Sequence, residues 1–209
     1  TVFSSIDKFG RYAFSNQPPI TKWNLARFAE CLIPLIDKNE DTAIKLATDI
    51  IDNFQNFYED KWLNMMRDKL GLFGEDKNDK KLINDLLNWM EINGADYTNT
   101  FCYLMNFNIK EKEKYNDKKF INWTNDWKKR IFLKSESMEK SINLMRKTNP
   151  IVIPRNHKVE EALKAANENN LEVMNNLLNI LSKPYVIKKN IENYQSPSKD
   201  KEYKTFCGT

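Results

Sequence analysis

The chain has 209 residues, 41% of them hydrophobic, and its 33 basic and 29 acidic side chains give a net charge of +4. This length suits one domain, or one domain with a tail, and the near balance of charge indicates a mixed, solvated surface. No apolar run is long enough to span a membrane, so no membrane partner is expected. Glycine is scarce, with 5 in the chain, and apolar residues recur at helical spacing, which predicts an all-α fold.

The segment from Gly10 to Ile36 contains the densest set of structural signals. Pro18 and Pro19 disfavour a helical conformation in the residue before each of them, so we expect an extended loop and then a helix capped by Thr21. Pro34 should bend the last turn of that helix. Apolar residues recur at helical spacing on one face of this helix, and we predict that this face is buried. The face comprises Leu25, Phe28, Ala29, Leu32, Ile33 and Ile36. Trp23 is also predicted to lie in the core.

Further helical patterns follow in chain order. A long helix after Asp41 should stop near Gly71 to Gly74, and Asn93–Gly94 should end the next helix because both residues tolerate the left-handed conformation. Thr98 and Asn156 are the predicted caps of two later helices. We expect the helices beyond Gly74 over 82–90, 96–107, 116–133, 136–147, 159–166 and 171–181.

Aromatic and basic residues gather between positions 110 and 133. A stripe of four aromatic side chains at helical spacing is more typical of a core than of a base-stacking platform. The basic residues of 110–119 and 128–130 are interleaved with acids or aromatics, which favours a solvated face over contact with nucleic acid. The aromatic stripe consists of Phe120, Trp123, Trp127 and Phe132.

The cysteines are Cys31, Cys102 and Cys207, and His157 is the single histidine. An odd cysteine count without close spacing argues against a disulfide framework and a zinc site, and one histidine argues against a catalytic triad within the chain. Cys31 and Cys102 lie in apolar helical patterns and are predicted to be buried. Cys207 lies in a polar segment and is predicted to be an exposed, modifiable thiol; the alternatives are an intramolecular disulfide and a cysteine without a role.

Two arginines stand in conspicuous loops, Arg11 before the first helix and Arg155 in the proline-containing segment from Asn149 to His157. The planar guanidinium group suits contacts that hold a loop in place. We therefore predict that carboxylates or carbonyls fix both side chains. A direct catalytic role for Arg155 is the less favoured alternative.

Several motifs occur together and in one order: TVFSSID, GRYAFSNQP, WNLARFAE, DYTNTF, NPIVIPRNHKVEEAL, KPY and FCGT. In this combination the chain resembles the selenoprotein O family, which comprises protein adenylyltransferases with a protein-kinase-like fold. The resemblance implies that residues 1–185 form the C-terminal helical lobe of that fold. Within it, residues 1–22 would correspond to an activation-segment-like loop, and residues 186–209 would be a polar tail.

The resemblance also implies a function for the whole protein, transfer of AMP from ATP to hydroxyl side chains of proteins, with ATP and Mg²⁺ as cofactors. No catalytic residue, cofactor site or metal site is expected in this chain, because the family's nucleotide-binding lobe lies before the position that corresponds to Thr1. Its partners would be protein substrates and that nucleotide-binding lobe.

The alternative function is a non-catalytic helical scaffold or interaction module. The implied location is the cytoplasm in a bacterium or the mitochondrion in a eukaryote. Cys207 matches a family position that carries cysteine or selenocysteine, so the resemblance makes it a possible redox residue.

Overall fold

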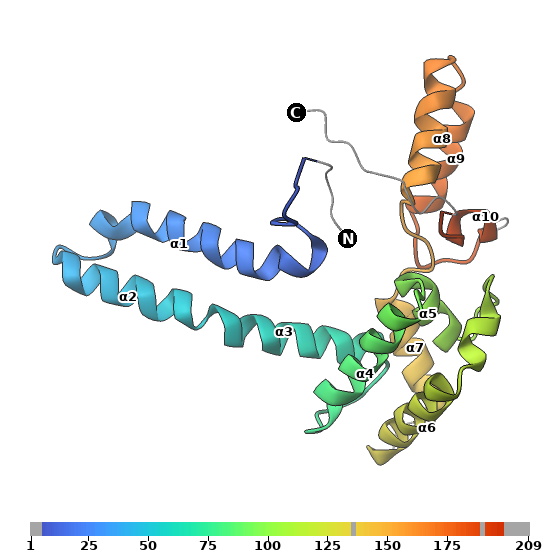
Figure 1. Ribbon diagram of the computed structural model, residues 1–209, viewed down its shortest axis with the longest axis horizontal. Helices are drawn as coiled ribbons and strands as arrows, with labels where there is room; N and C mark the ends of the chain where they lie inside the picture. The colour runs from blue at the N-terminus through green and yellow to red at the C-terminus, as the bar shows by residue number, and fades with distance from the viewer. Residues whose placement is uncertain (1–5, 135–136, 189–190, 199–209) are drawn as a thin grey trace. The chain divides into compact units, whose positions relative to one another are not determined.

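The computed structural model describes residues 6–134, 137–188 and 191–198, and all regular secondary structure in these ranges is helical, as predicted (Figure 1). These residues form two compact units that divide within one helix, one unit over 6–62 and the other over 63–198. No helix in the described ranges is long and apolar enough to cross a membrane. The elements are η1 (Phe14–Asn16), α1 (Gln17–Ile36), α2 (Glu40–Asp52), α3 (Phe54–Lys69), α4 (Asp79–Ile92), α5 (Tyr97–Leu104), η2 (Lys112–Asn116), α6 (Lys118–Leu133), α7 (Met138–Thr148), α8 (Asn156–Asn167), α9 (Glu172–Leu181) and α10 (Glu192–Gln195).

In the first unit, α1 and α2 form a helical hairpin (Figure 1). Helix α1 begins at Gln17 and not after Thr21, because Pro18 and Pro19 occupy its first turn, where a missing N–H breaks no helical hydrogen bond. The predicted long helix after Asp41 is two helices, α2 and α3, which separate at Asn53. Asparagine favours helix ends because its side chain competes for backbone hydrogen bonds.

The prediction of a buried face on α1 is wrong for several of its residues. Trp23 is 48% exposed, Phe28 is 60% exposed and Leu25 is also exposed, while Leu32 is half-buried. In the first unit α1 packs on α2, and Ala26 and Ile33 line a groove together with residues of that helix. Ile33, a member of the predicted face, thus lies toward α2, whereas Leu25 and Phe28 lie on a side of α1 that α2 does not cover.

The second unit has the larger apolar core, to which α3 to α7 contribute. The indole N–H groups of Trp89, Trp123 and Trp127 each donate a hydrogen bond of 2.8 Å, to a carboxylate oxygen of Asp117, the carbonyl of Leu82 and the carbonyl of Leu70, respectively. The prediction that the aromatic stripe is core is confirmed for Phe120, Trp123 and Trp127, whereas Phe132 is exposed. The largest fully buried side chains include Phe101, Phe120, Met66, Leu70, Ile83, Leu86, Met105, Ile131 and Met145.

The predicted helix ends are partly correct. Helix α4 ends at Asn93–Gly94, where Gly94 has a φ of 55°. Helix α5 is capped by Asp96 and not by Thr98, because the Asp96 carboxylate accepts the backbone N–H of Asn99 at 2.9 Å. Helix α8 begins at Asn156, so Arg155 and not Asn156 occupies the cap position.

The segment after Tyr185 was expected to be a polar tail, but part of it packs against the second unit's core. Ile191 and Gln195 are buried, and Glu192–Gln195 form the short helix α10. The side-chain amide of Gln195 donates to the carbonyl of Ile151 at 2.8 Å. This hydrogen bond secures a helix that has too few residues to be stable by itself.

Candidate functional site

The candidate site of the second unit is a junction of Asp96, Arg155 and Gln195, which come from three separate segments. The two terminal nitrogens of Arg155 donate to the two carboxylate oxygens of Asp96 at 2.5 and 2.8 Å, a bidentate pairing. Arg155 Nη2 also donates to the backbone carbonyl of Gln195 at 2.8 Å. The Arg155 side chain is only 10% exposed, so the contact is well shielded from water.

The junction joins the start of α5, the loop before α8 and helix α10. Asp96 accepts from Arg155 and also caps α5, while its backbone carbonyl accepts the hydroxyl of Thr100 at 2.8 Å. Asn99, in the first turn of α5, donates its side-chain amide to the same carbonyl of Gln195 at 3.2 Å. Arg155 thus has the contacts expected of a residue that fixes its loop.

The other predicted loop arginine, Arg11, has different contacts. Its guanidinium group lies 4.7 Å from the ring centroid of Trp23 and 5.7 Å from that of Tyr12, and the residue is exposed. Its backbone N–H, not its side chain, donates to the carboxylate of Asp7 at 2.9 Å. A cation–π contact therefore takes the place of the carboxylate or carbonyl that we expected.

Lys69, Tyr97, Phe101 and Cys102 lie near one another in the second unit. The Lys69 ammonium nitrogen lies 4.5 Å from the ring centroid of Phe101 and 5.2 Å from that of Tyr97, and burial lowers the pKa of Lys69. Burial, and next the negative charge of Asp96, raise the pKa of the Cys102 thiol to about 12. Cys102 is therefore protonated at neutral pH and is a poor nucleophile.

The predictions for the three cysteines have three different outcomes. Cys102 is fully buried, as predicted, but Cys31 is exposed, because it lies on a side of α1 that no described residue covers. The prediction for Cys31 is therefore wrong. Cys207 lies outside the described residues, so its role as an exposed or redox-active thiol stays a prediction.

In the chain alone we expect a thiol reagent to modify Cys31 readily and Cys102 only after unfolding. The reason is the combination of exposure at Cys31 and burial with a raised pKa at Cys102. Peptide mapping after a short treatment of the native protein, with a urea-unfolded sample as the control, measures this. Equal modification of the two cysteines in the native protein would contradict the assignment.

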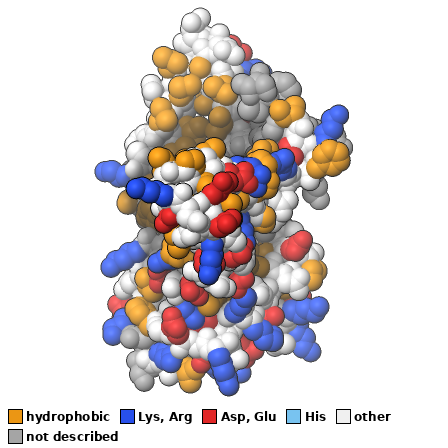
Figure 2. Space-filling model, turned by 90° about the vertical axis from the view of Figure 1, so that its left-hand side faces the viewer, with side chains coloured by type: hydrophobic (Ala, Val, Ile, Leu, Met, Phe, Trp, Pro, Cys, Tyr) orange, Lys and Arg blue, Asp and Glu red, His pale blue; other side chains and the backbone are white. Residues whose placement is uncertain are grey.

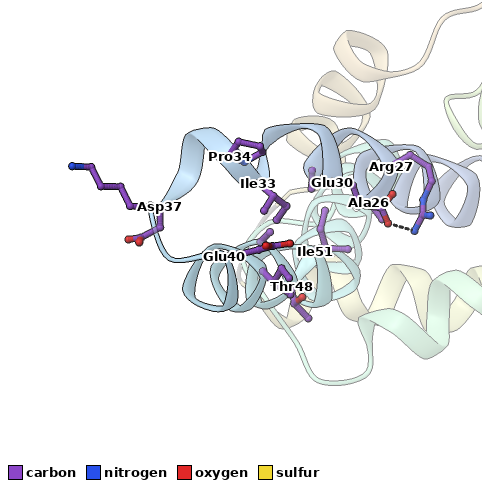
Figure 3. A pocket seen from close by; sticks show the side chains of 13 residues that line it. Ala26, Arg27, Glu30, Ile33, Pro34, Asp37, Glu40, Thr48 and Ile51 are labelled. Carbon is purple, nitrogen blue, oxygen red and sulfur yellow. Dashed lines mark ion pairs between the residues drawn. The ribbon is translucent and has the colours of Figure 1, made fainter.

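Two of the cavities in the described part of the chain lie beside residues discussed above. The larger one, about 880 Å³, is an open groove between α1 and α2, where Arg27 and Glu30 form an ion pair of 2.6 Å at its rim (Figure 3). The other, about 550 Å³, lies beside His157 and Lys158 of α8 and Tyr194 of α10. Burial, and next the charge of Lys158, lower the pKa of His157, so this side chain is neutral at pH 7.

The described residues contain no group of three or more His, Cys, Asp or Glu side chains that could hold a metal ion. On the face shown in Figure 2, acidic and basic side chains are interspersed, as the near balance of charge predicts.

Sequence reasoning missed a buried charge cluster of Asp79, Arg67 and Arg130. The fully buried carboxylate of Asp79 accepts from Arg67 Nε at 2.7 Å and from Arg130 Nε at 2.6 Å. Arg130 Nη2 also donates to the carbonyl of Gly74 at 3.0 Å. Each of the three residues stands in a sequence rich in charged residues, so no local pattern distinguished them from the solvated ones.

The comparisons with known proteins give the family. A sequence profile described as "Protein adenylyltransferase SelO" matches residues 2–182. A Pelagibacter ubique protein named "Protein nucleotidyltransferase YdiU" is 58% identical over 211 residues, which is 100% of this chain and 44% of that protein. Proteins of the same name from Nitrosococcus oceani and Alcanivorax borkumensis are 46% and 48% identical over 43% and 44% of their lengths.

The chain thus spans less than half the length of these relatives but matches them from end to end of its own sequence. The family resemblance that the sequence motifs indicated is confirmed. On this evidence the chain belongs to the SelO/YdiU family of protein adenylyltransferases.

Proposed function

We propose that this chain is the helical part of a protein adenylyltransferase that transfers AMP from ATP to Ser, Thr or Tyr hydroxyls of protein substrates. The observation that carries the proposal is the match of the family profile to residues 2–182. ATP and Mg²⁺ would act in the whole protein, whose other partners are its protein substrates and its nucleotide-binding lobe. The named relatives are bacterial, which favours the cytoplasm over the mitochondrion as its location.

The proposed transfer forms one bond to the α-phosphorus and breaks another. The hydroxyl oxygen of the substrate attacks the α-phosphorus of ATP, and the bond from that phosphorus to the oxygen bridging the β-phosphate breaks. Pyrophosphate leaves with the electron pair of that bond, and the hydroxyl proton passes to a base or to solvent. Reactions of this class depend mainly on positioning and on neutralisation of charge.

The role that we assign to this chain is mechanical support. The junction of Asp96, Arg155 and Gln195 fixes α5, the loop before α8 and α10 to one another, and the Asp79 cluster fixes α3, α4 and α6. A rigid helical unit of this kind can hold neighbouring parts of an enzyme in one geometry. The same features would serve a non-catalytic scaffold, which is the second candidate function.

An activity assay on a chimaera separates the two candidates. In the chimaera, this chain replaces the matching 44% of the Pelagibacter ubique relative, and the unaltered relative is the positive control. We expect radiolabel from ATP labelled on the α-phosphate to enter protein, with release of pyrophosphate, and no label from the γ-phosphate. A folded chimaera that gives no label while the relative does would support the scaffold, and label from the γ-phosphate would indicate phosphoryl transfer instead.

Replacing Arg155 by Ala should lower the free energy of unfolding by about 2 kcal/mol, because the partly buried carboxylate of Asp96 loses its bidentate partner. Arg155→Lys should restore only part of this loss, since an ammonium group cannot form the planar fork. Urea unfolding of the chain alone measures both. Lys81→Ala, which removes an exposed ion pair with Asp85, is the control, and an equal loss in that variant would contradict a special role for Arg155.

A further inference from the structure

Helix α1 has apolar side chains on two different sides. With about 100° of rotation per residue, Ala26 and Ile33 fall on the side that lines the groove shared with α2. A second apolar stripe falls on another side of the helix and follows the spacing i, i+3, i+7, i+10. This second stripe consists of Leu25, Phe28, Leu32 and Leu35.

Within the first unit, three of the four residues of the second stripe are exposed, Leu32 is half-buried, and none carries a charge. Leu35 is 82% exposed, and Phe28 and Leu25 are also exposed. The charged residues of α1 lie elsewhere: Lys22 pairs with Asp52 of α2 at 3.4 Å, and Arg27 pairs with Glu30.

A surface helix of a globular protein normally has one apolar stripe and a polar opposite face, whereas a helix with apolar residues on several sides is an interior helix. The absence of charge in the second stripe means that its partner must also be apolar. Exposed apolar side chains that gather on one side of a helix are typical of an interaction site.

The length of the relatives indicates which partner this is. The match to the Pelagibacter ubique protein covers the whole of this chain but only 44% of that protein, so more than half of the relative lies beyond the matched part. A membrane surface is a poorer partner, because an interfacial helix needs a free face rich in Lys and Arg, and one side of α1 is already packed on α2.

We propose that the second apolar stripe of α1 is the docking surface for an apolar surface of the polypeptide that the relatives carry beyond the part matched by this chain. Helix α1 is then an interior helix of the whole protein, held on one side by α2 and on another by that polypeptide. This inference does not depend on the reaction that the protein catalyses, and its test has no activity readout.

The test compares thiol labelling of Phe28→Cys in the chain alone and in the chimaera, with Cys31 and Cys207 replaced by serine. We expect a maleimide to modify position 28 readily in the chain alone and about tenfold or more slowly in the chimaera, because labelling then requires local opening. Peptide mapping confines the readout to that position. Ile92→Cys on α4, where the native side chain is 69% exposed, is the control and should react equally in both proteins.

Leu35→Cys provides a second probe of the stripe should Phe28→Cys prevent folding. Equal labelling of the stripe in the two proteins would overturn the proposal. Slow labelling of the stripe in the chain alone would overturn the proposal as well. The molecular mass of the chain in solution would then show whether a second copy covers the stripe. The labelling rates do not depend on whether the chimaera transfers AMP. Failure of the docking proposal is therefore distinguishable from failure of the proposed function.

Discussion

Replacing Asp79 by Asn is expected to lower the free energy of unfolding by about 3–5 kcal/mol, the usual cost of leaving a buried charge without its partner. The carboxylate is fully buried, and both Arg67 and Arg130 donate to it at 2.7 Å or less. An amide retains the shape but not the charge that compensates the two guanidinium groups. Urea unfolding of the chain alone measures the loss.

The matched control for this substitution is Asp85→Asn, which removes the carboxylate of an exposed pair with Lys81 on the same helix. Exposed pairs of this kind contribute about 0.5 kcal/mol or less. If the two substitutions lower the free energy of unfolding by the same amount, the Asp79 cluster does not stabilise the second unit in the way that its geometry indicates.

The contribution of Asp79 should also depend on pH. Burial by itself raises the pKa of this carboxyl group, but the hydrogen bonds from Arg130 and Arg67 outweigh burial and hold the pKa below its ordinary value. A carboxyl group whose pKa is lowered by folding stabilises the protein fully above its unfolded pKa of about 3.9 and loses that effect as the pH falls further. The difference in stability between the native protein and Asp79→Asn should therefore be constant above pH 5 or so and shrink below about pH 4.

Local sequence patterns predicted most of the helices of the second unit. The breaks at Gly71–Gly74 and Gly94 and the buried aromatic residues of α6 were correct, because each depends on backbone conformation or on the spacing of residues close in sequence. The caps were less accurate. Asp96 and Thr98 are both good capping residues, and the one that caps α5, Asp96, also pairs with Arg155, which is far away in the sequence.

The long-range polar contacts could not be predicted either, because they join residues that are far apart in the sequence. Gln195 was assigned to a polar tail, yet it accepts from Arg155 and donates to Ile151, contacts that only the folded chain creates. Helix α1 shows what the spacing of apolar residues cannot predict by itself. Periodicity identified apolar residues that recur along α1, but it could not indicate that Trp23, Leu25 and Phe28 are exposed and not in the core.

Replacing Gly71 by Ala should destabilise the second unit by about 2–5 kcal/mol, the sum of left-handed backbone strain and overpacking. Gly71 ends α3 with a φ of 66°, and the Leu72 N–H donates to the Arg67 carbonyl at 2.9 Å, as in a Schellman motif. A β-carbon at this position would lie 2.5 Å from the carbonyl oxygen of Ser141 in α7. That atom belongs to the backbone of a packed helix, so a side-chain rotation cannot relieve the clash.

Gly94→Ala separates the two causes of this loss. Gly94 has a similar φ of 55°, but a β-carbon there would meet nothing within 4 Å. Its replacement should therefore cost only the conformational strain, about 1–2 kcal/mol. Urea unfolding of both variants gives the two losses in free energy of unfolding. Their difference is the cost of the steric clash between the end of α3 and α7. Equal losses in the two variants would mean that α7 can move away from Gly71, and that the second unit is less rigid at this contact than a supporting role requires.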